Sequence, residues 1–175
     1  EITATLEVLA NLGVERRHLE LIRKDAGRAS AVAQTIIAGY VVVTEPLFSR
    51  DMRKEGWKLL EHTPRRITSV ADLELVEFLK SGETRVNGEE MVRRARMELN
   101  ANLGQEDAEW LLEHKNEIPK EWRSYYLTFP GTVWRDGNGD RHVPCLCWRG
   151  ERWYLHFHWL SRDWSGRARL LRFRK

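Results

Sequence analysis

Two cysteines and two histidines in the C-terminal third carry the most specific chemistry in the sequence. Cys145 and Cys147 lie one residue apart, and His156 and His158 follow after a short turn. In a hairpin with a two-residue turn, opposed residues point to the same face of the sheet, so these four side chains would share a face with Tyr154. Thiolates and imidazoles are ligands that zinc prefers. The residue types therefore match those of a Cys2His2 zinc site.

The spacing argues against a metal. Zinc ligands are usually separated by about two to four residues rather than one, and ligands from two flat strands do not converge easily on a tetrahedron. Free cysteines packed as small apolar residues, with histidines on a semi-polar face, explain the same pattern. A disulfide between Cys145 and Cys147 would be strained. We therefore expect free thiols, no metal and no cofactor.

The sequence contains few features that are typical of an enzyme. Cys147 could act as a nucleophile with His156 or His158 as its base, but nothing supplies an oxyanion hole. The chain has no glycine-rich phosphate loop, no Gly-x-Ser-x-Gly and no His-Glu-x-x-His motif. We expect a binding protein rather than an enzyme.

Aromatic rings and positive charge gather in the same C-terminal segment. Six of the eight tryptophans fall between Trp122 and Trp164, and residues 122–175 carry eleven Lys and Arg against four acids. Rings interleaved with arginine can stack on bases and neutralise phosphates. We therefore predict a nucleic-acid interface in the last strand and in the loop before it, formed by Arg167, Arg169, Arg172, Arg174 and Trp164.

The same features have two other interpretations. Arginines on an edge strand keep that edge soluble and prevent pairing between molecules. A basic rim could also bind an acidic protein, or the acidic helical part of another copy, because the other 121 residues carry a net charge of −4. A protein-interaction or self-association module is therefore the alternative function.

A second pattern, near the N-terminus, is similar to a DNA-binding motif. Leu12-Gly13-Val14 lies between two predicted helices, with Arg16 and Arg17 on the second, as in a helix-turn-helix. Leu9 occupies the position where that motif packs a small residue. An ordinary tight connection between two helices explains the segment equally, so Arg16 and Arg17 are accessory candidates.

The N-terminal part is predicted to be helical. Apolar periodicity indicates helices at residues 3–12, 15–24 and 26–38, an extended segment at 40–44 and a further helix after Ser49. The polar stretch at residues 62–66 contains a proline and lacks apolar periodicity, which is typical of a domain boundary. We expect a helical module at residues 1–64 and an α+β domain at residues 65–175.

Three helices are predicted in the second domain. Ser69 and Asp72 resemble a capping pair before Leu73, Val76 and Leu79, with Gly82 as the stop. A second helix is expected from Asn87 to Leu99 and a third from Gln105 to His114, with a brief helix after Pro119.

The periodicity then changes to that of strands. Residues 125–134, 141–148, 152–160 and 167–173 are strand-length runs separated by glycine-containing turns. In the third run, Trp153, Leu155, Phe157 and Trp159 share one face. The expected fold class is α+β, with three helices packed on a four-stranded antiparallel β-meander.

Composition limits the class of protein. The 175 residues are 42% hydrophobic and 31% charged, which is typical of a folded chain. No stretch approaches the roughly 20 apolar residues of a membrane span. We expect a soluble, cytoplasmic protein, with an oligomeric state that the sequence does not reveal.

Several segments resemble an uncharacterised family of short, tryptophan-rich proteins from uncultured small-genome bacteria. The resemblance covers about residues 69–173 and rests on Leu99–Gln105 (LNANLGQ), Leu111–His114 (LLEH), Phe129–Arg135 (FPGTVWR) and Trp153–Leu155 (WYL). It implies a bacterial intracellular protein. It brings no known activity, ligand or functional residue.

Overall fold

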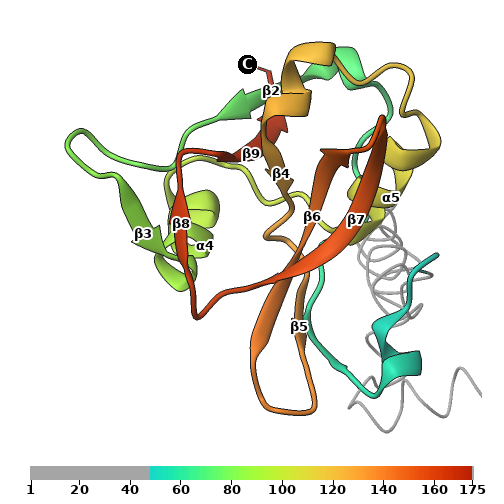
Figure 1. Ribbon diagram of the computed structural model, residues 1–175, viewed down its shortest axis with the longest axis vertical. Helices are drawn as coiled ribbons and strands as arrows, with labels where there is room; N and C mark the ends of the chain where they lie inside the picture. The colour runs from blue at the N-terminus through green and yellow to red at the C-terminus, as the bar shows by residue number, and fades with distance from the viewer. Residues whose placement is uncertain (1–47, 175) are drawn as a thin grey trace, which may run out of the picture. The chain divides into compact units, whose positions relative to one another are not determined.

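Residues 48–174 are described by a computed structural model of the protein (Figure 1). The chain divides into two units, Glu1–Glu45 and Pro46–Lys175, and the description below concerns the second. The helices predicted between residues 3 and 38, the extended segment at 40–44, and Arg16 and Arg17 all lie outside the described residues. On the N-terminal side of the boundary predicted after residue 64, residues 58–61 form a strand of the main sheet.

The described residues are mostly β-structure. The strands are β1 (Lys58–Glu61), β2 (Leu73–Val76), β3 (Arg85–Asn87), β4 (Tyr126–Thr128), β5 (Val133–Arg135), β6 (Arg141–Arg149), β7 (Arg152–Trp159), β8 (Asp163–Ser165) and β9 (Ala168–Phe173). The α-helices within residues 48–174 are α4 (Gly88–Met97) and α5 (Gln105–Glu113). Short 3₁₀ turns are η1 (Met52–Glu55), η2 (Val70–Asp72) and η3 (Lys120–Ser124).

Seven strands form one curled, mixed sheet. Its order is β1-β5-β6-β4-β9-β2, with β7 paired to β6 (Figure 1). β4 and β9 run parallel, and the other neighbours run antiparallel. β3 and β8 form a separate antiparallel pair.

The sheet forks at β6. β7 pairs with β6 from His142 to Arg149 and occupies one of its two edges. The other edge is shared by two short strands, because β5 pairs at Arg141 and His142 while β4 pairs at Cys145 and Leu146. β5 continues to β1, and β4 continues to β9 and β2. Among the described strands, β7 has no second neighbour.

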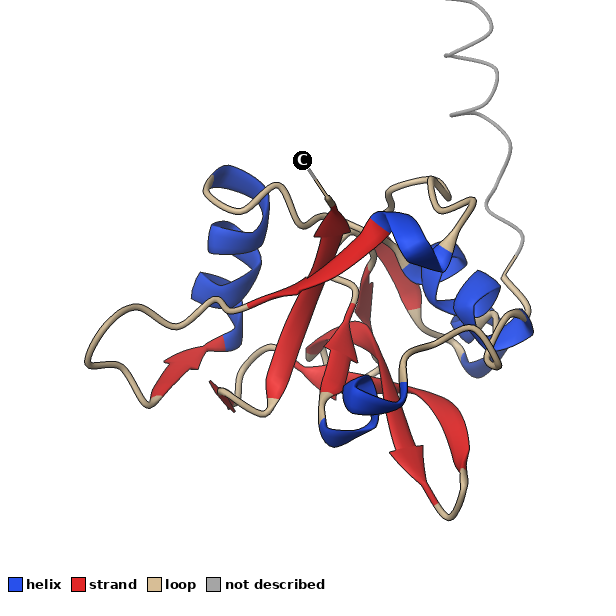
Figure 2. Cartoon of the chain, turned by 90° about the horizontal axis from the view of Figure 1, so that it is seen from above, coloured by secondary structure: helices blue, strands red, loops and turns tan. Residues whose placement is uncertain are grey.

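Each face of the sheet is covered by one helix, and Figure 2 shows α4 and α5 on opposite sides of the strands. On one face, Ala108 and Leu111 of α5 join a cluster with residues such as Leu127, Leu146 and Trp153. On the other, α4 contributes to a cluster that contains Met91, Ala95, Val143, Cys145 and Leu170. Residues 142–147 of β6 are consequently all buried. Burial on both faces explains why β6 is a continuous apolar run rather than an alternating one.

The predicted fold class is wrong for the described residues. Instead of three helices on a four-stranded antiparallel meander, two α-helices flank a mixed seven-stranded sheet. The last strand, β9, pairs with β4 and β2 rather than with β7. A meander assumes that consecutive strands are neighbours, whereas β8 carries the chain away from β7 to pair with β3. Local periodicity does not reveal such long-range pairing.

The helix predicted from Ser69 to Gly82 is also wrong. Ser69 does act as a cap, since its Oγ accepts a hydrogen bond from the Ala71 amide, but it caps only the 3₁₀ turn η2. The following residues form β2. The apolar spacing fits a helix face, but Leu73 and Leu75 also alternate as a strand does, and pairing with β9 decides between the two.

Two further predictions are corrected. The helix predicted after Ser49 is only the 3₁₀ turn η1. The strand predicted at residues 125–134 is interrupted at residues 129–132, so its halves are β4 and β5 on the two branches of the fork. Within this break, a Cβ on Gly131 would lie 2.6 Å from the carbonyl oxygen of Asn102, so the close approach of two backbones requires glycine.

The remaining elements are confirmed. The predicted helices at residues 87–99 and 105–114 are α4 and α5, and the brief helix after Pro119 is the 3₁₀ turn η3. The Asn87 side chain accepts a hydrogen bond from the Glu89 amide (2.9 Å) at the start of α4. The β6–β7 hairpin has the expected two-residue turn, with Arg149 opposite Arg152. Within residues 48–174, no helix is both long and apolar enough to span a bilayer.

Candidate functional site

Two arginines of the last strand are neutralised by acids from β2 and the residue after it. Arg169 Nη2 donates to Glu77 Oε1, and Arg172 Nε donates to Glu74 Oε1, each over 2.7 Å. Arg172 and Glu74 face each other directly in the β2–β9 pair. An arginine held by a carboxylate attracts a phosphate less strongly, because the acid already occupies its donors.

The other two arginines of this segment differ from each other. Arg174 Nε donates to the carbonyl oxygen of Leu73 (3.0 Å). Arg167 forms no ion pair with any residue that the structure describes, and its guanidinium lies 5.6 Å from the centroid of the Tyr126 ring. The four arginines therefore do not form one cationic row, and Arg167 has the surroundings best suited to an anion.

Trp164 is a core residue. Although the sequence predicts it in a loop, it lies in β8, opposite Val86, with 3% of its surface exposed. Its indole Nε1 donates to the carbonyl oxygen of Trp159 (3.2 Å). A side chain so enclosed has little surface left for stacking on a base.

The cysteines and histidines share a face, as the hairpin register predicts. Cys145 lies opposite His156, and Cys147 lies opposite Tyr154. Burial raises the pKa of the Cys145 thiol to about 12 and also raises the pKa of Cys147. A protonated thiol is a poor nucleophile and a poor metal ligand. Among residues 48–174, His, Cys, Asp and Glu side chains do not gather in threes or more with the geometry to hold a metal ion.

A cationic hollow lies beside this face, where η3, β4, β6 and the start of β9 meet. It has a volume of about 160 Å³. Arg123 comes from η3, Arg149 from the end of β6, and Arg167 directly precedes β9. We call it the central hollow, and the described residues that line it include no acid: Arg123, Ser124, Tyr125, Tyr126, Cys147, Trp148, Arg149 and Arg167.

Two further hollows adjoin the central hollow. The tip hollow, of about 570 Å³, shares Cys147 and Arg149 with it and extends past Gly150 at the hairpin turn to Arg50, Tyr154, Leu155 and His156. A smaller hollow of about 100 Å³ shares Tyr126 and Arg167 and contains His158 and Asp163. The three together form what we call the basic groove. Among its described lining residues, Asp163 is the single acid.

Aromatic rings hold the arginines of the central hollow in place. The Arg123 guanidinium lies 3.9 Å from the centroid of Trp148, and Arg167 lies over Tyr126. Tyr126 also interacts with Arg149 and raises the pKa of its guanidinium. A guanidinium stacked on a ring keeps the N–H groups at its edge available. The stacking therefore orients these cations without neutralising them.

Three buried polar atoms at the groove have no hydrogen-bond partner among the described residues. They are Arg123 Nε, His156 Nε2 and His158 Nδ1. Buried polar atoms in folded proteins are nearly always hydrogen-bonded, so an unpartnered one indicates a place for water or a ligand. Arg123, His156 and His158 each line one of the three adjoining hollows, so the walls of the groove carry polar groups without a partner among the described residues.

The two groove histidines are neutral at pH 7. Burial lowers the pKa of His156 to about 4, and the charges of His158, Arg149 and Arg50 act in the same direction. Burial and Arg162 also lower the pKa of His158. A neutral imidazole has one donor and one acceptor nitrogen, so these side chains can hydrogen-bond to a ligand without repelling the neighbouring arginines.

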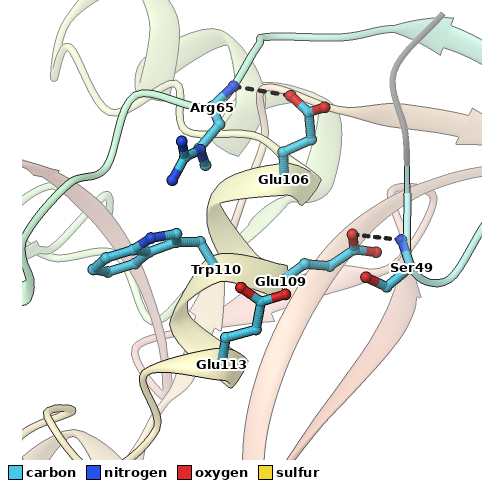
Figure 3. A pocket seen from close by; sticks show the side chains of 6 residues that line it. All are labelled: Ser49, Arg65, Glu106, Glu109, Trp110 and Glu113. Carbon is cyan, nitrogen blue, oxygen red and sulfur yellow. Dashed lines mark hydrogen bonds between the residues drawn. The ribbon is translucent and has the colours of Figure 1, made fainter.

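A second large hollow is acidic (Figure 3). It has a volume of about 380 Å³ and is lined by Ser49, Arg65, Glu106, Glu109, Trp110 and Glu113. Two of its carboxylates hold the backbone in place, because Glu109 accepts hydrogen bonds from the Ser49 and Arg50 amides and Glu106 accepts one from the Arg65 amide. The acidic character of this hollow is therefore explained by carboxylates that hold the backbone, without a ligand.

Only part of the groove was predictable from the sequence. The shared face of Cys147, Tyr154 and His156 was predictable from the period-two pattern and the hairpin turn. Arg123 was not, because η3 reaches the groove only through the tertiary fold. The position of Arg149 was predictable, because it is the last residue of a strand beside a tight turn and the hairpin fixes where it lies.

Comparisons with protein-family models, with curated proteins and with solved structures find no match for this chain. The resemblance to a bacterial family therefore stays a prediction.

Proposed function

We propose that this protein binds nucleic acid without catalysing a reaction, and that the basic groove is its binding surface. The phosphate backbone would lie along Arg123, Arg149 and Arg167, and the aromatic side chains of the groove would contact bases. Nucleic acids combine regularly spaced anions with flat rings, and the groove offers a complement to both.

The observation that carries this proposal is the difference between two sets of arginines. In the groove, stacking on Trp148 and Tyr126 orients the guanidinium groups, and no acid lines the central hollow among the described residues. On β9, Glu74 and Glu77 neutralise the arginines. Phosphate binding releases counterions from the nucleic acid only where the protein supplies cations that are not already paired.

The proposal keeps one of the residues predicted from the sequence and reduces the role of others. Arg167 belongs to the groove. Arg169, Arg172 and Arg174 would contribute mainly to the surrounding field, and Trp164 would support the sheet. Arg16 and Arg17 lie outside the described residues and stay accessory candidates.

The test is the salt dependence of binding to a labelled single-stranded oligonucleotide of mixed sequence, measured by fluorescence anisotropy. Each phosphate neutralised contributes about −0.7 to the slope of log K against log salt concentration for a single strand. Three arginines predict a slope of about −2, and the double variant Arg149→Ala/Arg167→Ala should reduce it to roughly −0.7.

The matched control removes the same charge from the last strand. Arg172→Ala/Arg174→Ala should leave the slope close to that of the unmodified protein, because Arg172 is paired with Glu74 and Arg174 donates to a backbone carbonyl. A slope near zero in the unmodified protein would refute nucleic-acid binding. Equal losses in the two double variants would show that net charge, rather than the groove, drives association.

The alternative function, a protein-interaction or self-association module, is favoured by one observation. Within residues 48–174, β7 pairs with β6 alone. None of the described strands occupies its second edge, which could therefore pair with a strand from a partner. In the same experiment, light scattering without nucleic acid distinguishes the alternative, because self-association gives a mass that rises with protein concentration.

A further inference from the structure

We infer that the basic groove is selective for single-stranded nucleic acid, and that the tip hollow accepts one unpaired base while the central hollow holds the adjacent phosphates. This inference rests on the proposed function and specifies its ligand. It follows from the different character of two hollows that share Cys147 and Arg149.

The tip hollow has the size and lining of a base-binding site. Its volume of about 570 Å³ lies within the range of small-ligand pockets. Its lining residues include Cys147, Tyr154, Leu155 and His156. The neutral His156 ring also lines this hollow, and its one donor and one acceptor nitrogen give the wall a polar character that suits a base. Its cations are Arg149, which it shares with the central hollow, and Arg50, which pairs with Glu55 (3.9 Å) and donates to the Leu155 carbonyl oxygen (3.0 Å). The hollow therefore suits a ring better than an anion.

Tyr154 supplies the stacking surface. It is 37% exposed, which is unusual for a large ring on a strand whose neighbours are mostly buried or half-buried. The Arg152 guanidinium lies 4.7 Å from the centroid of the Tyr154 ring, and its Nε donates to the Tyr154 hydroxyl. Arg152 therefore holds the hydroxyl end of the ring, and a base stacks on the ring from within the hollow.

A duplex does not meet these requirements. In double-stranded DNA or RNA the base faces are stacked on each other and their hydrogen-bonding edges are paired, so no single base can enter a hollow without being flipped out. Single strands can splay a base outward at little cost, and stacking on a protein ring stabilises that arrangement. The central hollow alone would bind both forms through their phosphates.

The experiment compares oligonucleotides of equal length: a single-stranded dT 12-mer, a single-stranded rU 12-mer and a blunt 12-base-pair DNA duplex, all at the same low salt concentration. We expect the single strands to bind at least about 10-fold more tightly than the duplex. Loss of one stacked base corresponds to roughly 5- to 150-fold in affinity. Tyr154→Leu should therefore weaken single-strand binding by that factor and leave duplex binding unchanged.

The same strand supplies the control. Trp159 is 39% exposed, close to the exposure of Tyr154, but it lies on the opposite face of β7. Trp159→Leu should leave single-strand binding unchanged, and Tyr154→Phe should preserve it because the ring is retained. Far-ultraviolet circular dichroism of each variant verifies that it is folded.

The outcomes separate the two proposals. Equal, salt-dependent affinity for single strands and duplex, with no effect of Tyr154→Leu, would overturn the inference and leave nucleic-acid binding in place. Absence of binding to all three oligonucleotides would overturn both. Tighter binding of the rU strand than the dT strand would still support the inference and would show an additional preference, either for the ribose 2′-hydroxyl or for a base without the 5-methyl group.

Discussion

Several polar side chains of this protein that look like surface residues in the sequence turn out to hold the fold together. Gln105, at the start of α5, accepts a hydrogen bond from the Trp134 indole (2.7 Å) and donates to Glu109 (2.8 Å). Glu109 in turn fixes the backbone of residues 49 and 50. Glu106 of the same helix likewise accepts a hydrogen bond from the Arg65 amide (2.9 Å). Their structural role explains why this helix is acidic although it packs on the sheet.

At the residue scale, the buried histidines predict a specific pH dependence of stability. The pKa of His156 is lowered to about 4 in the folded protein by burial, while an unfolded histidine has a pKa of about 6.5. Between these values the unfolded chain binds a proton that the folded chain does not. The free energy of unfolding should therefore fall as the pH falls from about 6.5 to about 4. Above about pH 6.5 the histidine is neutral in both states, so it no longer makes the stability depend on pH.

Urea unfolding at pH 7 and pH 5 tests this dependence. His156→Phe keeps a ring of similar shape and removes the titrating group, so the variant should lose less stability between the two pH values than the unmodified protein. Carboxylates such as Glu83, whose pKa is lowered to about 2 by Arg94, titrate below this interval. An identical loss in both proteins would contradict a neutral, buried His156.

At the element scale, the β6–β7 hairpin positions the groove. Its tight turn requires backbone angles that strain one of its two residues. Gly150 has φ of 50° and Glu151 has φ of 67°. Positive φ at both positions matches the two-residue turns whose twist fits a hairpin. Glycine adopts this conformation freely, whereas a residue with a side chain is strained there by about 1 kcal/mol. Glu151 is exposed, so contacts with the rest of the protein do not explain its strained backbone. The geometry of the tight turn does.

Glu151→Gly should therefore raise the free energy of unfolding by about 1 kcal/mol, because it relieves this strain. The measurement is the midpoint of urea unfolding, with Glu151→Ala as the control that removes the charge but keeps the strain. Oligonucleotide binding should be retained, since the turn geometry is unchanged. A variant with glycine that is no more stable than the variant with alanine would refute the explanation.

At the scale of the whole molecule, the fork in the sheet makes the described residues interdependent. Residues 48–59, which contain η1 and the start of β1, cover the buried Trp134 with Phe48, Met52, Trp57 and Leu59. Residues 48–64 thereby complete one branch of the fork, and β9 with β2 complete the other. Each branch depends on β6, which supplies the shared edge.

This arrangement predicts how the chain can be shortened. A chain of residues 46–175 should fold, because those residues form one of the two units. A chain of residues 65–175, which begins at the boundary predicted from the sequence, loses the cover of Trp134. The lost burial of several large apolar side chains costs on the order of 5 kcal/mol, comparable with the whole stability of a small domain.

Thermal unfolding followed by circular dichroism distinguishes the two chains. The longer chain should show a cooperative transition, and the shorter one should show none or a transition at a much lower temperature. Similar transition temperatures for both would support the boundary after residue 64.

The sequence by itself determined those parts of the protein whose signals are local. Capping at Asn87, the period of 3.6 in α4 and α5, and the two-residue turn between β6 and β7 are set by residues within one or two turns of each other, and all were predictable. So was the shared face of Cys147, Tyr154 and His156, because a known turn length fixes the register of a hairpin.

Only the tertiary structure decided the rest, because the deciding contacts join residues far apart in the chain. Leu73–Val76 become a strand through pairing with β9, and the break at Gly131 sends one predicted strand into two branches. The same long-range contacts neutralise Arg169 and Arg172 with acids from the β2 region and bring Arg123 to Arg149 and Arg167. Composition identified a cationic, aromatic segment, whereas tertiary pairing determined which of its cations remain available to a ligand.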